Sequence, residues 1–271
     1  MKVGLLYSMR DVAGVNMARE IVSIMGEQFS LSGRSYELIS FEREILYMKG
    51  DEITGFDYFV VLSRHSGTPG RPIFTAHVPG NFGPAKYGGE PYTLGVAIPS
   101  LMKEYLLSVK EEADRIGYEV GFEPTHHGPT LDVPMAFLEI GCDERAWNDA
   151  KAIKVAANAV IKALEAWNPS KYRAAIAFGG PHVNDHFTKV ELMTDIAIGH
   201  TARKHDAGHV DKVMIGMAIK RNGEKPALAI VDAKGLRGED RQRIEAALDE
   251  LGLRRVRVKK VLRDAQEKAQ V

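Results

Sequence analysis

The 271-residue sequence predicts an α/β fold with a mostly parallel sheet flanked by helices. Short apolar runs alternate with segments of helical spacing, and this order gives parallel strands joined by helices. Some runs, such as FDYFVVLS, are apolar at almost every position, as expected of strands covered on both faces. Long segments rich in Gly and Pro interrupt the order. We therefore expect a single α/β domain over residues 1–271 with large insertions, and a smaller C-terminal lobe over about residues 200–271 stays open as an alternative.

The first elements follow in order from the N-terminus. KVGLLYS is expected to be the first strand, and DVAGVNMAREIVSIM the first helix, with Asp11 as its N-cap. YELISF and FDYFVVLS are the next strands. Residues 63–93 are dense in Gly and Pro and contain one predicted strand, PIFTAHV, and loops of this length are often functional. A helix is predicted from about Ile98 to Ile116.

The second half continues the alternation. YEVGFEPTHHGPTLDVPMAFLEIG predicts a strand, a loop and a strand, and Asp143 is expected to cap a long Ala-rich helix that ends near Trp167. RAAIAF, PALAIVD and TDIAIGH are predicted strands, the last ending at His200. HVDKVMIGMAIKR and GEDRQRIEAALDELGL are predicted helices, the second capped by Gly252. RRVRVKKV is expected to be a final, basic strand.

Composition limits the classes of function. The 36 basic and 36 acidic residues give a net charge of zero, so the chain lacks the basic excess typical of nucleic-acid binders. A local basic patch remains open, because an enzyme that touches only an RNA end needs few phosphate contacts. One cysteine, Cys142, rules out an internal disulfide and is typical of the cytoplasm. No apolar run approaches a membrane span. Abundant Lys, Arg and Glu with few Gln and Asn predict a thermophilic source.

Histidines follow the predicted strands more often than chance placement would give. Six of the nine lie at strand ends or in the loops that leave them: His65, His77, His126, His127, His182 and His200. Strand ends at one edge of a parallel sheet converge, so we expect several of these imidazoles to share one cleft. Turn and capping histidines bonded to backbone carbonyls are the alternative.

The local contexts indicate metal or acid–base chemistry. With one cysteine, a zinc site must use imidazoles and carboxylates, and no spacing selects among Glu123, Asp132, Glu139 and Asp185. His182 and His186 are four apart and would share a face if a helix began near Pro181. GxGxxG, GxxxxGK[ST], HExxH and GxSxG are all missing, which argues against the sites that these motifs build.

Four segments, LSRHSG, AHVPGNFG, EPTHHGPT and AFGGPH, closely resemble the archaeal and plant type of D-aminoacyl-tRNA deacylase, and the resemblance runs nearly end to end. It implies hydrolysis of the ester between a D-amino acid, such as D-tyrosine, and the 3′ end of tRNA. It also implies zinc as cofactor, and a fold similar to peptidyl-tRNA hydrolases and phosphorylases. The alternatives are a phosphorylase, a zinc amidohydrolase acting on a small molecule, or a non-catalytic protein that binds tRNA ends.

Residues and resemblance together give the expected site. The catalytic residues are His126, His127 and His182, and the zinc ligands are drawn from these three and His186. The substrate-binding residues are His65, His77, Thr125, Gly179 and Gly180, with the two glycine N–H groups as an oxyanion contact. The cations expected at the tRNA acceptor end are Arg64, Arg71, Lys86 and the 254–263 segment. A histidine-only route assisted by the ribose 2′-OH stays open, as does the choice between monomer and dimer.

Overall fold

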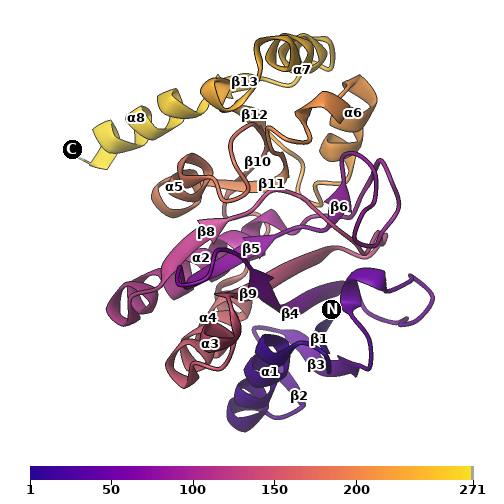
Figure 1. Ribbon diagram of the computed structural model, residues 1–271, viewed down its shortest axis with the longest axis vertical. Helices are drawn as coiled ribbons and strands as arrows, with labels where there is room; N and C mark the ends of the chain where they lie inside the picture. Colours follow the sequence, from indigo (N-terminus) through magenta and orange to yellow (C-terminus); the bar gives the residue numbers. More distant parts are fainter. Residues whose placement is uncertain (270–271) are drawn as a thin grey trace.

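The computed structural model describes residues 1–269, which form two sheets stacked along the long axis of the molecule (Figure 1). The first sheet has seven strands in the order β2-β3-β1-β4-β9-β5-β8, and the second has four in the order β11-β10-β12-β13. The first contains β1 (Lys2–Ser8), β2 (Gln28–Leu31), β3 (Arg34–Phe41), β4 (Tyr58–Ser66), β5 (Ile73–His77), β8 (Glu119–Phe122) and β9 (Met135–Cys142). The second contains β10 (Arg173–Phe178), β11 (Ile196–Ala202), β12 (Leu228–Val231) and β13 (Arg255–Arg257). A short hairpin, β6 (Gly80–Asn81) and β7 (Thr93–Leu94), lies within the Gly/Pro-rich segment.

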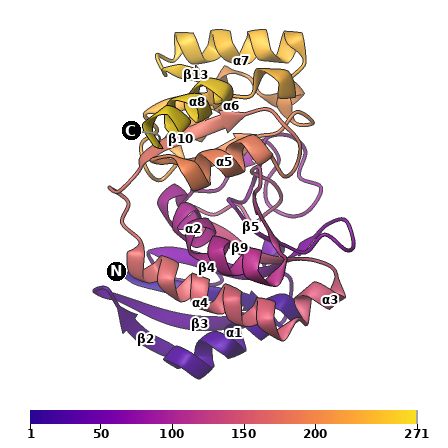
Figure 2. The ribbon, with the colours of Figure 1, turned by 90° about the vertical axis from the view of Figure 1, so that its left-hand side faces the viewer.

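The helices are α1 (Val12–Met25), α2 (Pro99–Ile116), α3 (Glu144–Trp147), α4 (Ala150–Ala166), α5 (Asp185–Met193), α6 (Lys212–Lys220), α7 (Gly238–Glu250) and α8 (Val258–Ala269). Figure 2 shows α1, α2 and α4 on the same face of the first sheet. Apolar side chains of the central strands, such as Leu62, Phe74 and Leu138, pack beneath them. Helix α2 also contacts β11 and α5, so one core joins both sheets. No helix within residues 1–269 is long and apolar enough to cross a membrane.

Strand direction follows the prediction except at β5, β8 and the edge strand β2. The second sheet is parallel throughout, and β1, β3, β4 and β9 are parallel to one another. However, β5 pairs antiparallel with β9 and parallel with β8, so β5 and β8 run against the rest. At the sheet edge, β2 is antiparallel to β3. The mostly parallel α/β fold is confirmed, but β5, which carries His77, and β8, which precedes the His126–His127 loop, point the opposite way.

Capping residues set the helix boundaries. The Asp11 side chain accepts a hydrogen bond from Gly14 N at 3.0 Å, which confirms it as the N-cap of α1. Asp143 caps only the four-residue α3, because a second cap follows at once. The Asp149 side chain accepts hydrogen bonds from the first turn of α4 and restarts the helix there. The expectation of one Ala-rich helix from Asp143 is therefore wrong.

Two strand predictions also need correction. In the basic segment only Arg255–Arg257 is a strand, and α8 begins at Val258. The reason is that Val258 and Val261 are spaced for a helix face and are both buried. In the segment TDIAIGH the strand does not stop at His200, because β11 continues to Ala202.

Candidate active site

The candidate site lies on the face of the first sheet opposite α1, α2 and α4. Side chains alternate between the two faces of a strand, and the cross-strand register places the odd-numbered residues of β4, β5 and β9 on this face. These include His65 on β4, His77 on β5 and Glu139 on β9, and Glu123 directly follows β8. The predicted meeting of histidines at one carboxyl edge is wrong, because β5 and β8 run against β4 and β9. The histidines meet over the face of the sheet instead.

A fully buried carboxylate, Glu123, links two of the predicted histidines. Its Oε1 lies 2.9 Å from His65 Nδ1, and its Oε2 lies 2.7 Å from His182 Nε2. A second buried carboxylate, Glu139, has its Oε2 3.7 Å from His65 Nδ1 and 3.8 Å from His77 Nδ1. Thr75 donates its hydroxyl to the same Glu139 oxygen at 3.2 Å. The imidazoles are therefore arranged around two carboxylates that spacing alone did not select.

The environment drives the pKa values of this group apart. Burial disfavours the charge on Glu123, but hydrogen bonds from His182 and His65 hold the pKa of that carboxyl well below its ordinary value. Burial likewise favours neutral His65, yet Glu123 and Glu139 outweigh it and raise the pKa of His65 to about 10. Burial raises the pKa of Glu139 to about 7. The site thus holds an ion pair between Glu123 and His65 beside Glu139, whose pKa is near neutrality. Neighbouring groups with pKa values set apart in this way are typical of acid–base catalysis.

Three further imidazoles form a neutral group. His77 Nε2 and His127 Nε2 are 3.2 Å apart, and the His126 ring centroid is 4.2 Å from that of His77. His126 Nδ1 donates to Pro124 O at 2.8 Å, and His127 Nδ1 donates to Gly128 O at 2.6 Å. These bonds place the remaining lone pair of each ring on Nε2, where that of His127 faces His77 Nε2 at 3.2 Å. Burial lowers the pKa of all three rings, so they are neutral near pH 7.

The HHGP turn is held in an unusual backbone conformation. His127 has φ 43°, a left-handed value that is uncommon for a bulky residue and that often marks a functional site. Gly128 is needed because a Cβ there would lie 2.2 Å from Gly89 N and 2.3 Å from Leu46 O. Two other loops therefore occupy the space beside this glycine, so its role is to let the three segments pack together.

The cluster has the donor set of a metal site. Three groups bring their ligand atoms within 4.8 Å of one another: His77, His126 and His127; His65, Glu123 and His182; and His77, Glu123 and Glu139. The first group fits a divalent metal, because its imidazoles are neutral and because His126 and His127, with Nδ1 bonded to a carbonyl, present Nε2 as a ligand. His77 Nδ1, buried and without a hydrogen-bond partner, adds a further nitrogen to this region.

His182 and His186, predicted as a pair of metal ligands four residues apart, contact different carboxylates. His182 lies on the loop after β10, and α5 begins only at Asp185, so the two rings do not share a helical face. His186 Nδ1 is 3.1 Å from Asp232 Oδ2, whereas His182 Nε2 contacts Glu123. The second nitrogen of His182, Nδ1, accepts from Arg203 at 2.6 Å. Only His182 of this pair belongs to the groups within residues 1–269 that could hold a metal.

Other predicted contacts serve the fold. Gly179 N donates to Ala202 O at 2.8 Å and Gly180 N to Gly235 O at 3.0 Å, so neither is free for an oxyanion. The oxyanion prediction for these glycines is therefore wrong. His200 is buried in β11 and belongs to none of the groups within residues 1–269 that could hold a metal, and its Nδ1 is 3.1 Å from Thr125 Oγ1. Thr125 accordingly acts through this bond and its backbone, which fix the start of the HHGP segment.

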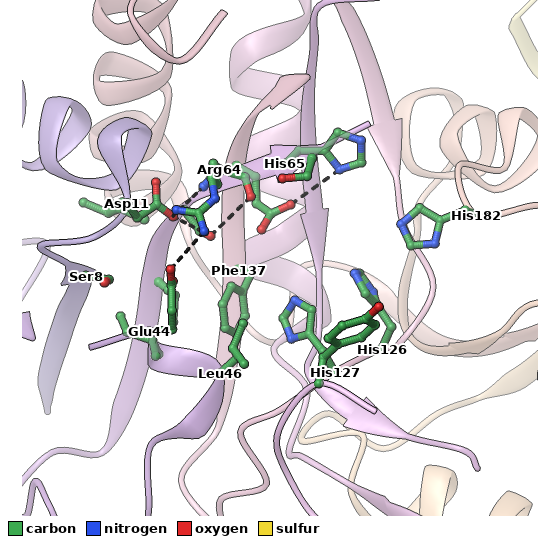
Figure 3. Close-up of a pocket in the computed structure, with 17 residues that line it drawn as sticks. Ser8, Asp11, Glu44, Leu46, Arg64, His65, His126, His127, Phe137 and His182 are labelled. Carbon is green, nitrogen blue, oxygen red and sulfur yellow. Dashed lines mark hydrogen bonds and ion pairs between the residues drawn. The ribbon is translucent and has the colours of Figure 1, made fainter. Parts of the chain in front are cut away.

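A cavity of about 530 Å³ opens from the cluster. Figure 3 shows His126, His127 and His182 around one side of it and Asp11, Arg64 and Glu44 around the other. Arg64 is held in place: its guanidinium donates to Glu44 Oε1 at 2.9 Å, and its backbone N donates to Asp11 Oδ2 at 2.9 Å. The sequence reasoning missed Asp11 and Glu44 as lining residues. Asp11 was assigned only to the cap of α1, and no sequence motif indicates that Glu44 lines the cavity.

The other expected phosphate contacts are mostly paired. Arg71 is bound through two nitrogens to Glu119. Within the 254–263 segment, Arg255, Arg257 and Lys260 form ion pairs with neighbouring carboxylates. Lys86 lines a smaller cavity of about 370 Å³ that shares His126, His127 and His182 with the first.

Comparison with known proteins places the chain. The sequence model of the D-aminoacyl-tRNA deacylase family matches residues 53–256. A D-aminoacyl-tRNA deacylase of Korarchaeum cryptofilum is 62% identical, and the match covers 97% of this chain and 95% of the relative. A D-aminoacyl-tRNA deacylase of Thermococcus kodakarensis is 36% identical, and the match covers 91% of this chain and 96% of the relative. A crystal structure described as a conserved protein of unknown function has a TM-score of 0.88, 29% identity and 97% coverage of both chains. The chain therefore belongs to the D-aminoacyl-tRNA deacylase family of hydrolases.

Proposed function

We propose that the protein hydrolyses the ester bond of D-aminoacyl-tRNA and releases the free D-amino acid and tRNA. The observation that carries the proposal is the cluster of His65, His77, His126, His127 and His182 with two buried carboxylates at the end of a cavity. Ester hydrolysis needs a proton acceptor, a positioned water and stabilisation of the oxyanion, and this cluster can supply each. Family membership supports the tRNA substrate and the D configuration.

The charged part of the cluster stabilises negative charge. His65 carries a proton near neutral pH because Glu123 and Glu139 raise its pKa to about 10. It lines the cavity, so its imidazolium faces the place where the ester carbonyl would develop charge. Glu123 keeps His65 charged and at the same time fixes the ring of His182 through its second oxygen. Glu123 is therefore a positioning residue.

Glu139 is suited to move the proton. Its pKa of about 7 lets it accept a proton from water and return it to the departing ribose oxygen near neutral pH. It lines the same cavity as His65 and His126. A histidine-only variant of this scheme would use His126 Nε2 as the acceptor, with the ribose 2′-OH assisting.

The metal that we propose is zinc, held by His77, His126 and His127. Support comes from their neutral state and from the backbone bonds of His126 and His127, the arrangement typical of imidazole ligands. When bound, zinc lowers the pKa of a coordinated water toward neutrality. His182, which is held by Glu123, would assist the reaction beside the metal. The contact of His186 with Asp232 argues against a role of His186 as a metal ligand.

We also propose that the protein acts in the cytoplasm, because its proposed substrate is tRNA and its one cysteine is typical of a reducing compartment. Its charged composition favours a thermophilic source. A melting temperature above about 90 °C would agree with this proposal. Sedimentation of the purified chain would decide between monomer and dimer.

The test is deacylation of paired D- and L-tyrosyl-tRNA, with and without chelator, together with metal analysis of the purified protein. We expect fast release of D-tyrosine, much slower release of L-tyrosine, and loss of activity with chelator that zinc restores. A fully active metal-free protein would eliminate the zinc assignment. Tight tRNA binding without deacylation would support the non-catalytic alternative. Release of a base or an amino group from small substrates would support a phosphorylase or an amidohydrolase.

A further inference from the structure

A groove of about 630 Å³ opens beside His182. Its lining includes His182, Arg203, Lys204, His205 and Arg237, and it contains no carboxylate. It meets the Lys86 cavity at His182, Arg203 and His205, so the groove continues to the histidine cluster. Figure 3 shows His182 on the side of the cluster away from Asp11 and Glu44. The groove and the acidic cavity therefore flank the cluster.

The groove carries unpaired positive charge. Arg203 is bound to Asp206 at 2.8 Å and to His182, so its charge is partly neutralised. Lys204 and Arg237 are exposed, and neither forms an ion pair with any residue between 1 and 269. In a chain with zero net charge, two unpaired cations beside the reactive cluster form a local anion-binding surface.

The opposite cavity has the complementary charge. Asp11 and Glu44 share the single guanidinium of Arg64, and Glu139 lies at the cluster end. The protonated His65 also lines this cavity, and the buried Glu123 at 2.9 Å balances its charge. Asp11 and Glu44 against Arg64 therefore leave a surplus negative charge, which suits a substrate ammonium group. An aminoacyl ester has this polarity, since its α-ammonium lies on one side of the ester and nucleotide phosphates lie on the other.

We propose that the substrate crosses the histidine cluster in one orientation, with the phosphates of the single-stranded RNA 3′ end bound by Lys204 and Arg237. The aminoacyl group then occupies the cavity of Asp11 and Glu44, and the ester lies between them at the cluster. This orientation rests on the proposed function, because it takes the substrate to be an aminoacyl-tRNA. It assigns the RNA contacts to the loops after β11 and β12, and not to the basic C-terminal segment.

The test compares the double variant Lys204→Gln/Arg237→Gln with the wild type in two assays. The first assay measures the binding of a non-aminoacylated acceptor-stem RNA with a single-stranded 3′ end. Fluorescence anisotropy records binding at salt concentrations from about 0.05 to about 0.3 M. Each phosphate contact to a single strand contributes about 0.7 to the slope of log K against log salt. Loss of two contacts lowers the slope by about 1.4 and weakens binding about 25-fold at roughly 0.1 M salt.

The second assay measures kcat/KM for D-tyrosyl-tRNA and for 3′-O-D-tyrosyl-adenosine, which has no phosphate. We expect the double variant to lose activity on the tRNA far more than on the nucleoside ester. The matched control is Lys225→Gln/Arg145→Gln, which removes two exposed cations that line none of the three cavities described above. It should keep the wild-type salt slope.

The outcomes separate the two proposals. RNA binding with an unchanged salt slope in the double variant overturns the orientation, whatever the hydrolysis assay gives. Equal losses on the tRNA and on the nucleoside ester also overturn it, because the groove would then act on the cluster and not on the phosphates. A wild type that binds the RNA with the expected slope but hydrolyses neither ester overturns the proposed function and leaves the RNA contacts standing.

Discussion

Replacement of Glu123 by Gln tests the electrostatic centre of the site, because it keeps the shape of the side chain and removes its charge. The pKa of His65 is about 10 in the folded protein and about 6.5 in the unfolded chain. This difference corresponds to about 5 kcal/mol, shared between Glu123 at 2.9 Å and Glu139 at 3.7 Å. Glu123 is the nearer partner, so Glu123→Gln should cost about 3 kcal/mol of unfolding free energy.

The loss should depend on pH in a definite direction. The folded-state pKa of His65 is raised, so the stability it contributes is fully present below about pH 6.5 and is lost as the pH rises toward 10. The difference between wild type and Glu123→Gln in urea unfolding should be large near pH 6 and small near pH 10. NMR of the His65 ring should show its titration moving toward neutrality in the variant. The control is Glu119→Gln, which removes an exposed carboxylate at the start of β8, the strand that Glu123 directly follows. This change should have little effect on stability.

Two results would refute this reasoning. One is the same stability difference at pH 6 and pH 10, which would mean that His65 is not the group coupled to Glu123. The other is a His65 ring that stays protonated at pH 8 in Glu123→Gln.

Two further predictions concern stability. Burial lowers the pKa of His200 to about 4, so the stability it contributes is present above about pH 6.5 and is lost as the pH falls toward 4, by about 3 kcal/mol in total. His200→Gln should flatten the dependence of urea unfolding on pH in that window, and a variant with the wild-type slope would contradict the assignment. Gly128→Ala should lower the melting temperature and the activity together, because its Cβ would meet Leu46 O and Gly89 N. A Gly128→Ala protein with wild-type melting would show that these loops move apart freely.

Local patterns in the sequence predicted much of the fold. Asp11 marks the start of α1, and apolar runs mark nearly all the longer strands. The direction of β5 could not be predicted, because it depends on how a long Gly/Pro-rich segment returns across the sheet. The split between α3 and α4 escaped notice because Asp149 lies inside an otherwise continuous helical pattern.

The site could be predicted in its residue types but not in its geometry. His65, His77, His126, His127 and His182 come together as expected, although on a sheet face and not at its edge. Spacing could not select Glu123 and Glu139 among four candidate carboxylates, because burial and cross-strand register determine which oxygens reach the rings. The fate of backbone N–H groups, as at Gly179 and Gly180, depends on tertiary hydrogen bonds that no local motif records.

The most direct test of the central claim is single-turnover hydrolysis of D-tyrosyl-tRNA by the wild type, His126→Ala and His186→Ala. His126 lines both cavities at the cluster, whereas His186 is bound to Asp232 and belongs to none of the groups within residues 1–269 that could hold a metal. We predict that His126→Ala loses about 10²–10⁴-fold in rate while His186→Ala stays near the wild type. A His126→Ala protein with wild-type turnover would contradict the assignment of ester hydrolysis to this cluster.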